Sequence, residues 1–294
     1  MTQEKTWTVL EVLRFSQDYL AQRNVPEPRL SSEVLLSHVL SIPRIRLYTD
    51  HDRPLEPEEL AAFRKLLLRR ADREPAAYIT GRREFWSLDL AVGPDVLIPR
   101  PETEHLVEEA LKRLPPREET DRPLKVLDLG AGSGAVILAL ASERPGHFYA
   151  ATDASLAALG LARENARRLL PDADILWVCG HWFAPFAPNA SFDLIVSNPP
   201  YIDTAVLRAL EPEVSRFEPA LAIDGGPGGM DAIRAIMRAA PGHLASGGVL
   251  ALEMGHDQAD AVKALAREIP GLGEPAIVCD YAGLPRVAVM ERQG

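Results

Sequence analysis

Apolar side chains recur at three- and four-residue intervals through the first 80 residues. Residues 8–22 place several apolar side chains on one helical face, and residues 29–42 and 56–74 repeat the spacing. Pro57 stands at a first-turn position of the last segment, where its missing N–H has no helical partner to lose. Because no strand-like alternation interrupts these segments, residues 1–80 are predicted to form a small helical bundle.

The pattern changes in residues 81–100. Leu88, Leu90 and Val92 alternate with polar or small residues, which is typical of a half-buried strand. The segment 93–95 that follows is Gly-Pro-Asp and carries strong turn residues. We therefore predict a β-hairpin over residues 81–100, with this turn before its second strand, that links two domains.

From residue 101 to residue 294, apolar runs alternate with amphipathic segments. Alternating strands and helices predict an α/β domain whose doubly wound, mostly parallel sheet has seven strands, the last two forming an antiparallel pair. Residues 199–228 form one long irregular stretch, and a loop of that length in a compact domain is usually functional. The expected strands span residues 124–130, 147–153, 173–180, 192–198, 247–254, 275–280 and 286–292.

Composition narrows the class of protein. Hydrophobic residues at 47% are ordinary for a globular chain, and no apolar run approaches the ~18 residues of a membrane-spanning helix. The N-terminus lacks a basic segment followed by an apolar one, so no secretory signal is expected. Cys179 and Cys279 show no CxxC spacing, which suits a reducing compartment and argues against a thiolate metal site. We expect a cytoplasmic protein without metal or membrane contact.

Charge is distributed unevenly along the chain. The net charge of −10 lies after residue 80, because residues 1–80 carry as many acids as bases. Binding to duplex DNA needs basic patches that displace counterions, so no direct duplex binding is expected. Lys65, Arg69 and Arg73 fall on one face of the third helical segment, and we interpret this basic stripe as a solvated surface.

A glycine-rich turn follows the first strand of the α/β region. Gly130, Gly132 and Gly134 let the backbone approach a ligand closely, and a helix N-terminus behind them presents free N–H groups. Asp153 ends the next strand, where a carboxylate can accept both hydroxyls of a ribose. The spacing fits a nucleoside pocket and, because alanine follows, a dinucleotide fold as well. It predicts an adenosine-containing cofactor and leaves that choice open.

Two aromatic residues leave the third strand. Trp182 and Phe183 follow His181 at the carboxyl end of that strand, beside the expected ribose site. The Trp182 ring could stack on adenine or pack in the core under the loop, and its residue type favours neither.

The fourth strand ends in Asn198-Pro199-Pro200-Tyr201. The two prolines have no N–H, so nearby carbonyls have no local donors competing for them, and Asn198 adds a side-chain carbonyl. These acceptors, with the flat ring of Tyr201, suit a planar group that carries an NH₂. Holding its hydrogens exposes the nitrogen lone pair to an electrophile such as the methyl group of S-adenosylmethionine, and catalysis is then mostly orientation.

These motifs resemble the amino-group methyltransferases that use S-adenosylmethionine, and the rest of the chain narrows the resemblance. Four segments are similar to peptide-chain release factor glutamine methyltransferases: residues 83–111, 211–236, 252–258 and 280–290. The resemblance implies a Rossmann-like class I methyltransferase fold and methylation of the glutamine side-chain nitrogen (N5) in the Gly-Gly-Gln motif of class-1 release factors. The sequence PRPETE at residues 99–104 favours this substrate over a large-subunit ribosomal protein, the substrate of a close relative.

The resemblance also implies roles for residues. Residues 1–80 would bind the release factor, with the enzyme acting as a monomer. Arg100, Thr103 and Glu104 would line the site near the methionine moiety or order the linker. His181 replaces the acid that the family usually carries there, which puts one hydrogen bond to the adenine amine in doubt. The remaining assignments are Gly130, Ala131, Gly132, Ser133, Gly134, Asp153, Trp182 and Asn198 for the cofactor; Asn198, Pro199, Pro200 and Tyr201 for the substrate; and Asn198, Pro199 and Tyr201 for catalysis.

Three other functions remain open at this point. An adenine-N6 nucleic-acid methyltransferase shares the four-residue motif, but the acidic balance disfavours it. A nicotinamide-dependent oxidoreductase fits the glycine loop and leaves residues 198–201 unexplained. A binding module that has lost its chemistry is disfavoured by the intact motifs. Glu253, at the end of the fifth strand, either faces the site or pairs with a backbone N–H.

Overall fold

The computed structural model describes residues 6–188 and 190–293. The chain divides into two compact units. One contains the chain up to Gly81 together with Glu211–Phe217, and the other contains Arg82–Leu210 and the chain from Glu218 onward. The boundaries predicted from sequence did not include the short return of the chain to the first unit at residues 211–217.

The first unit is helical, as the apolar periodicity predicted. Thr8 caps the first helix, because its side chain accepts the Glu11 N–H while the Glu11 carboxylate accepts the Thr8 N–H. Pro57 opens the fourth helix at the expected first-turn position. A single apolar cluster that includes Leu20, Leu36 and Phe63 holds the helices together. The helices are α1 (Val9–Ala21), α2 (Pro28–Leu40), α3 (Arg46–Thr49), α4 (Pro57–Ala71), α5 (Ala76–Thr80) and α9 (Pro212–Phe217).

Helix α9 joins this unit through a network of ion pairs. Arg73 contacts Glu213 at 2.6 Å and Glu211 at 2.6 Å, and Arg70 contacts Glu213 at 2.7 Å. The Arg73 side chain is 15% exposed. The interpretation of Lys65, Arg69 and Arg73 as one solvated helix face is therefore wrong for Arg73. This residue lies beyond the end of α4, and acids 138 and 140 residues away in the sequence pair with it.

The second unit begins with the expected hairpin, but its turn lies elsewhere. Strand β1 (Arg82–Phe85) pairs with β2 (Leu88–Ala91) across Trp86 and Ser87. Both turn residues have positive φ, 52° and 58°, which gives the turn the twist that a two-residue hairpin requires. The predicted turn at residues 93–95 is present, with the Val96 N–H donating to the Gly93 carbonyl at 3.1 Å, but it follows β2 and does not join two paired strands.

The α/β sheet has the predicted seven strands, in the order β5-β4-β3-β6-β7-β9-β8. Strands β3 to β7 run parallel, and β9 is antiparallel to both β7 and β8. The chain order reverses between β3 and β6, which creates a switch point at their carboxyl ends. The strands are β3 (Lys125–Leu129), β4 (Phe148–Asp153), β5 (Ile175–Cys179), β6 (Phe192–Ser197), β7 (Leu244–Glu253), β8 (Ala276–Cys279) and β9 (Pro285–Glu291).

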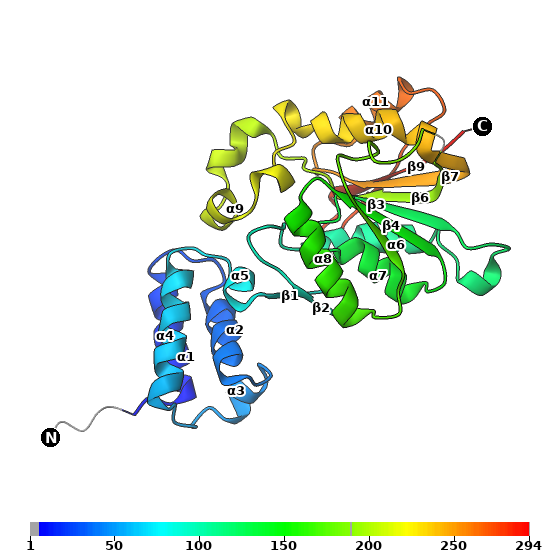
Figure 1. Cartoon of the computed structure of the whole chain (residues 1–294). Helices are drawn as coiled ribbons and strands as arrows, with labels where there is room; N and C mark the ends of the chain where they lie inside the picture. The colour runs from blue at the N-terminus through cyan, green and yellow to red at the C-terminus, as the bar shows by residue number, and fades with distance from the viewer. Residues whose placement is uncertain (1–5, 189, 294) are drawn as a thin grey trace. The chain divides into compact units, whose positions relative to one another are not determined.

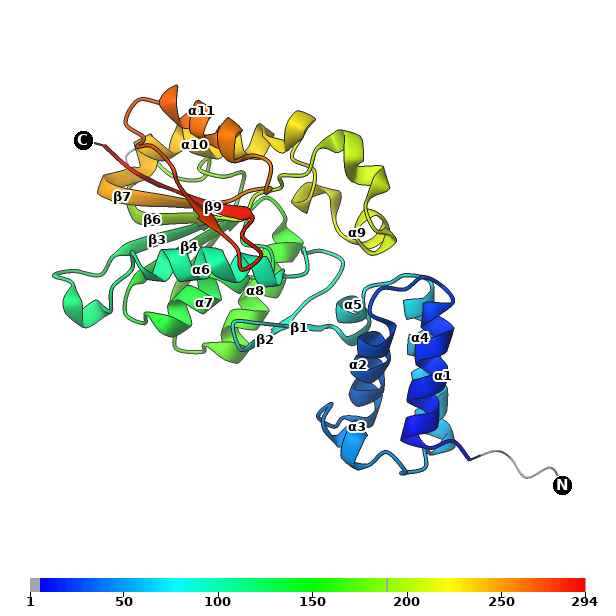
Figure 2. The same ribbon diagram turned by 180° about the vertical axis from the view of Figure 1, so that it is seen from behind.

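Helices cover both faces of this sheet (Figures 1 and 2). Strand residues alternate between the faces, so that Val126 packs in one apolar cluster and Leu127 in the other. Helices α6 (Glu104–Leu111), α7 (Ala135–Glu143) and α8 (Leu156–Leu169) cover the first face, and α10 (Asp231–His243) and α11 (Ala259–Arg267) cover the second. The doubly wound architecture is thereby confirmed.

The stretch 199–228 is less irregular than the sequence suggested. It contains the 3₁₀ turns η3 (Thr204–Ala209), η4 (Ala220–Ala222) and η5 (Pro227–Gly229) around α9. Pro212 and Pro227 start two of these elements, since proline suits a first helical turn and disrupts a helix interior. The remaining 3₁₀ turns are η1 (Pro101–Thr103) and η2 (Arg117–Glu119). No helix in the described residues is long and apolar enough to cross a membrane.

Candidate active site

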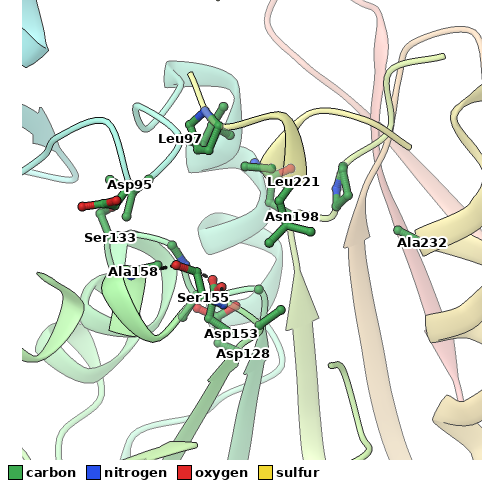
Figure 3. A pocket seen from close by; sticks show the side chains of 18 of the residues that line it. Asp95, Leu97, Asp128, Ser133, Asp153, Ser155, Ala158, Asn198, Leu221 and Ala232 are labelled. Carbon is green, nitrogen blue, oxygen red and sulfur yellow. Dashed lines mark hydrogen bonds between the residues drawn. The ribbon is translucent and has the colours of Figure 1, made fainter. Parts of the chain in front are cut away.

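A cavity of about 470 Å³ opens at the switch point of the sheet, at the carboxyl ends of β3, β4 and β6. Figure 3 shows Asp128, Asp153 and Asn198 among the side chains around it. Most of the predicted site residues meet here. The predicted residues that line it are Thr103, Gly130, Ala131, Gly132, Ser133, Asp153, His181, Trp182, Asn198 and Pro200.

The glycine loop lies directly against the cavity. Gly130 has φ +80°, and a Cβ added there would lie 3.4 Å from the Trp182 ring. Gly134 does not line the cavity. It caps α7, and an added Cβ would press on Leu138 and Ala162, at 3.2 and 3.3 Å. Its role here is close helix packing, which is one recognised use of the last glycine in such loops.

Asp153 is held rigidly at the end of β4. Its Oδ2 accepts the Gly132 N–H at 2.9 Å, and its Oδ1 accepts the Ser155 N–H at 2.8 Å. Each carboxylate oxygen has a further lone pair, so both can also accept a hydroxyl hydrogen from the cavity. This geometry suits the predicted ribose role.

Trp182 packs in the core under the loop, which was one of its two interpretations, and stacking on adenine stays a prediction. Its backbone is left-handed, with φ 46°, which is uncommon outside glycine and often marks a functional position. The ring packs on the second apolar cluster and also lines the cavity. His181 lines the cavity from an exposed position.

Asp128 was missed by sequence reasoning. It is 2% exposed at the end of β3, it lines the cavity, and its Oδ2 has no hydrogen-bond partner among the described residues. Burial, and secondarily the charge of Asp153, raise the pKa of Asp128 to about 7. A buried carboxylate with one oxygen that accepts no hydrogen bond suits a cationic ligand in the cavity. The sequence feature that could have identified Asp128 is its position directly before the glycine loop.

The charges around the cavity distinguish the two cofactor classes that the glycine loop left open. Five aspartates line it: Asp95, Asp128, Asp153, Asp224 and Asp231. No lysine or arginine is among its lining residues in the described chain. A dinucleotide would bring an anionic pyrophosphate against these acids, whereas the sulfonium and ammonium groups of S-adenosylmethionine are cations. The residues present fit S-adenosylmethionine.

The segment after the hairpin contributes residues that the sequence did not identify. Asp95 and Leu97 line the cavity, although their sequence indicated only a linker. Arg100 and Glu104 do not line it. Arg100 pairs with the buried Glu218 at 2.5 Å, and Glu104 accepts the Trp86 N–H at 3.0 Å. These two residues therefore order the linker, which was one of their two predicted roles.

The Asn198 amide is fixed at one end. Its Nδ2 donates to the Thr103 hydroxyl at 3.0 Å, while its Oδ1 accepts no hydrogen bond from the described residues. Pro200 lines the cavity, but Pro199 is buried and does not. Asn198 thus presents a free acceptor at the cavity, and its role toward a substrate stays a prediction.

Tyr201 is placed differently from the expectation of a flat face in the site. It is not among the cavity-lining residues, and its hydroxyl donates to Oε1 of Glu253 at 3.1 Å. Glu253 is fully buried, and burial raises its pKa to about 7 against the opposing effects of Thr103, Tyr201 and Arg286. Glu253 therefore matches neither of its two interpretations, because it does not line the cavity and the Tyr201 hydroxyl, not a backbone N–H, donates to it among the described residues.

The backbone after Asn198 is held by a buried side chain. Gln258 Nε2 donates to the Tyr201 carbonyl at 3.0 Å and to the carbonyls of Gly228 and Gly229 at 3.2 Å. A Cβ at Gly229 would lie 2.0 Å from the Tyr201 carbonyl oxygen, so only glycine fits there. The glycine-rich segment 225–229 therefore supports the backbone at Tyr201, a role that its sequence did not reveal.

No metal-binding arrangement emerges from the described residues, where no group of three or more His, Cys, Asp or Glu side chains is suitably placed. The proposed chemistry needs none, since it relies on hydrogen-bond acceptors and orientation.

Comparisons with known proteins agree with these features. The family model described as PrmC N-terminal domain matches residues 11–81, and that described as Methyltransferase small domain matches residues 108–211. A release factor glutamine methyltransferase of Geobacter sulfurreducens is 47% identical over 256 residues, covering 87% of this chain and 87% of that protein. One of the same name from Caulobacter vibrioides is 40% identical and covers 98% and 96%. A methyltransferase structure from Pyrococcus furiosus matches the fold with TM-score 0.52 at 19% identity, covering 70% and 89%.

Proposed function

We propose that this chain, which belongs to the release factor glutamine methyltransferases, methylates the N5 nitrogen of the glutamine in the Gly-Gly-Gln motif of class-1 peptide chain release factors. It is an S-adenosylmethionine-dependent methyltransferase. The observation that carries the choice of an amide substrate is the free Oδ1 of Asn198 in an acid-lined cavity beside the glycine loop.

Some residues of the site are proposed to bind S-adenosylmethionine, and others to bind the substrate amide. S-adenosylmethionine supplies an electrophilic methyl group on a sulfonium. Asp128 offers the unpartnered oxygen of its carboxylate to a cationic group, and Asp153 offers its remaining lone pairs to the ribose. Asn198 accepts a hydrogen from the substrate amide, with the Pro199 carbonyl proposed as the second acceptor. As the amide nitrogen becomes positive, these acceptors bind its hydrogens more strongly and so favour the transition state.

The helical unit is proposed to bind the release factor. It matches the family's N-terminal domain over residues 11–81 and carries no cavity-lining residue. A release factor as substrate places the activity in the cytoplasm, and we propose that the enzyme acts as a monomer. Size-exclusion chromatography with light scattering tests the monomer, and chemical cross-links between the intact protein and a release factor test the domain role, which they contradict if none maps to the helical unit.

One assay tests the substrate. The protein is incubated with methyl-labelled S-adenosylmethionine and either a class-1 release factor or its Gly-Gly-Gln variant in which glutamine is alanine. We expect label on the first and none on the second, and peptide mass spectrometry should locate it on the glutamine.

Two further arms separate the alternatives. Large-subunit ribosomal proteins replace the release factor in one, and a DNA duplex replaces it in the other. Preferential labelling of a ribosomal protein would show that this protein, and not a release factor, is the substrate. Labelling of DNA alone, or of the alanine variant, would overturn the proposal.

A further inference from the structure

A fully buried carboxylate lies behind the amide-binding side of the cavity. Glu253 ends β7 with 0% exposure, and neither cofactor binding nor substrate contact uses it. Four groups face it: the Tyr201 hydroxyl after β6, the Thr103 hydroxyl and the Glu102 carboxylate from η1, and the Arg286 guanidinium from β9. Its Oε2 has no hydrogen-bond partner among the described residues.

The orientation of the Asn198 amide depends on where the Thr103 proton goes. Thr103 is 3% exposed, and its hydroxyl has one hydrogen to donate. Above pH 7, where Glu253 is mainly ionised, it can only accept, and we infer that the Thr103 hydroxyl beside it donates to it and keeps its oxygen as an acceptor. The Asn198 Nδ2 donates to that oxygen at 3.0 Å, which leaves the Asn198 Oδ1 for the cavity.

The opposite arrangement is chemically possible without Glu253. Thr103 could then donate to the Asn198 Oδ1, and the amide would turn its NH₂ toward the cavity. A substrate NH₂ would then meet another NH₂, and neither group can accept a hydrogen from the other.

We propose that Thr103 and Glu253 are positioning residues, which fix the Asn198 amide with its oxygen toward the substrate NH₂. The inference rests on the proposed amide substrate. The same carboxylate accepts the Tyr201 hydroxyl, so one buried group orients both the first and the last residue of the motif.

The test compares Thr103→Val, which removes the hydroxyl at similar volume, with Thr103→Ser, which keeps it. We expect Thr103→Val to lower kcat roughly ten- to a hundred-fold, less than the ~10²–10³ typical of removing a direct transition-state contact. Cofactor affinity should change less than about two-fold, because the effect lies in orientation at the amide. Thr103→Ser should restore most of the turnover. A Thr103→Val enzyme with wild-type kcat would overturn the inference.

Glu253→Gln tests the source of the orientation. The new amide can donate to Thr103, so kcat should fall as in Thr103→Val while the fold persists in circular dichroism. Glu109→Gln is a matched control, since Glu109 is 5% exposed on α6 and does not line the cavity. An equal loss of kcat in both variants would show a general effect of removing buried charge and would contradict the inference.

Asn198→Asp supplies a background in which orientation cannot matter, because both carboxylate oxygens accept. Adding Thr103→Val to it should change kcat less than about three-fold, a near-absence of effect expected when one residue acts only through another. If the double variant loses as much as Thr103→Val alone, Thr103 acts by another route. Failure of the proposed function itself is distinguishable, because the wild-type enzyme would then label no release factor.

Discussion

The two sides of the cavity are built on different principles. The side proposed for the cofactor consists of backbone N–H groups and carboxylates, such as Asp153 held by two N–H donors. The side proposed for the substrate depends on one amide whose two ends differ, held through a hydroxyl at 3.0 Å. A carboxylate accepts from either oxygen, so the first side tolerates small reorientations. The second side functions only if its hydrogens are correctly placed.

The largest expected effect is a loss of turnover that comes from the substrate side of the cavity and leaves the cofactor side unchanged. Asn198→Ala should lower kcat about 10²–10³-fold, because it removes an acceptor that acts in the transition state. Cofactor affinity, measured by calorimetry, should stay within a few-fold of wild type. Turnover near the wild-type level would show that the acceptor argument is wrong.

Asp153→Ala is the matching change on the cofactor side. We expect cofactor affinity to fall on the order of a hundred-fold, because two hydroxyl contacts to a charged acceptor are lost, each worth ~1.5 kcal/mol at the lower end of the usual range. At saturating cofactor, kcat should stay close to wild type. Unchanged affinity would remove Asp153 from the ribose role.

The pKa of Asp128, raised by burial to about 7, predicts a pH effect confined to the cofactor side. The ionised form binds a cation, so cofactor affinity should weaken as pH falls below about 7, by at most tenfold per pH unit. Asp128→Asn should bind more weakly at pH 8 and lose the pH dependence.

Stability supplies the control for this prediction. Because the pKa of Asp128 is higher in the folded protein than in the unfolded chain, its ionisation destabilises the free protein as pH rises. Asp128→Asn should therefore be at least as stable as wild type at pH 8 in thermal unfolding. A pH-dependent affinity that persists in the variant would assign the titration to another group.

The smallest effect concerns His181, which lines the cavity where the family usually has an acid. His181→Asp should strengthen cofactor binding a few-fold, in line with one hydrogen bond worth ~0.5–1.5 kcal/mol. His181→Asn, which removes the ring and adds no charge, is the control. Equal affinity in both variants and wild type would show that no adenine contact is made here.

Local signals allowed much of the molecule to be predicted from sequence. The strands, the glycine loop and the Asn198 motif can each be recognised from a few neighbouring residues. The structure places the loop and most of the predicted site residues at one cavity. Thr103 and Glu253 act on this motif across 95 and 52 residues of chain. Such contacts depend on which strands become neighbours, which no local pattern contains.

Other differences between the sequence predictions and the structure also arise from contacts that the local sequence does not contain. The hairpin turn lies at Trp86-Ser87, although neither residue type usually adopts positive φ, because the paired strands impose the conformation. Asp128 was missed because only its burial makes its carboxylate unusual. The predicted roles of the site residues, the release-factor-binding domain and the monomeric state stay predictions.

The return of residues 211–217 to the helical unit makes that unit discontinuous in sequence. The chain passes between the units at residues 81–82, 210–211 and 217–218. Cutting it after Gly81 would release the first five helices yet leave α9 behind, with Glu211 and Glu213 deprived of Arg70 and Arg73. The orphaned segment connects directly to the cavity wall at Pro219 and Leu221. Evolution or engineering that exchanges the helical unit for another recognition module must therefore replace two pieces of the gene together.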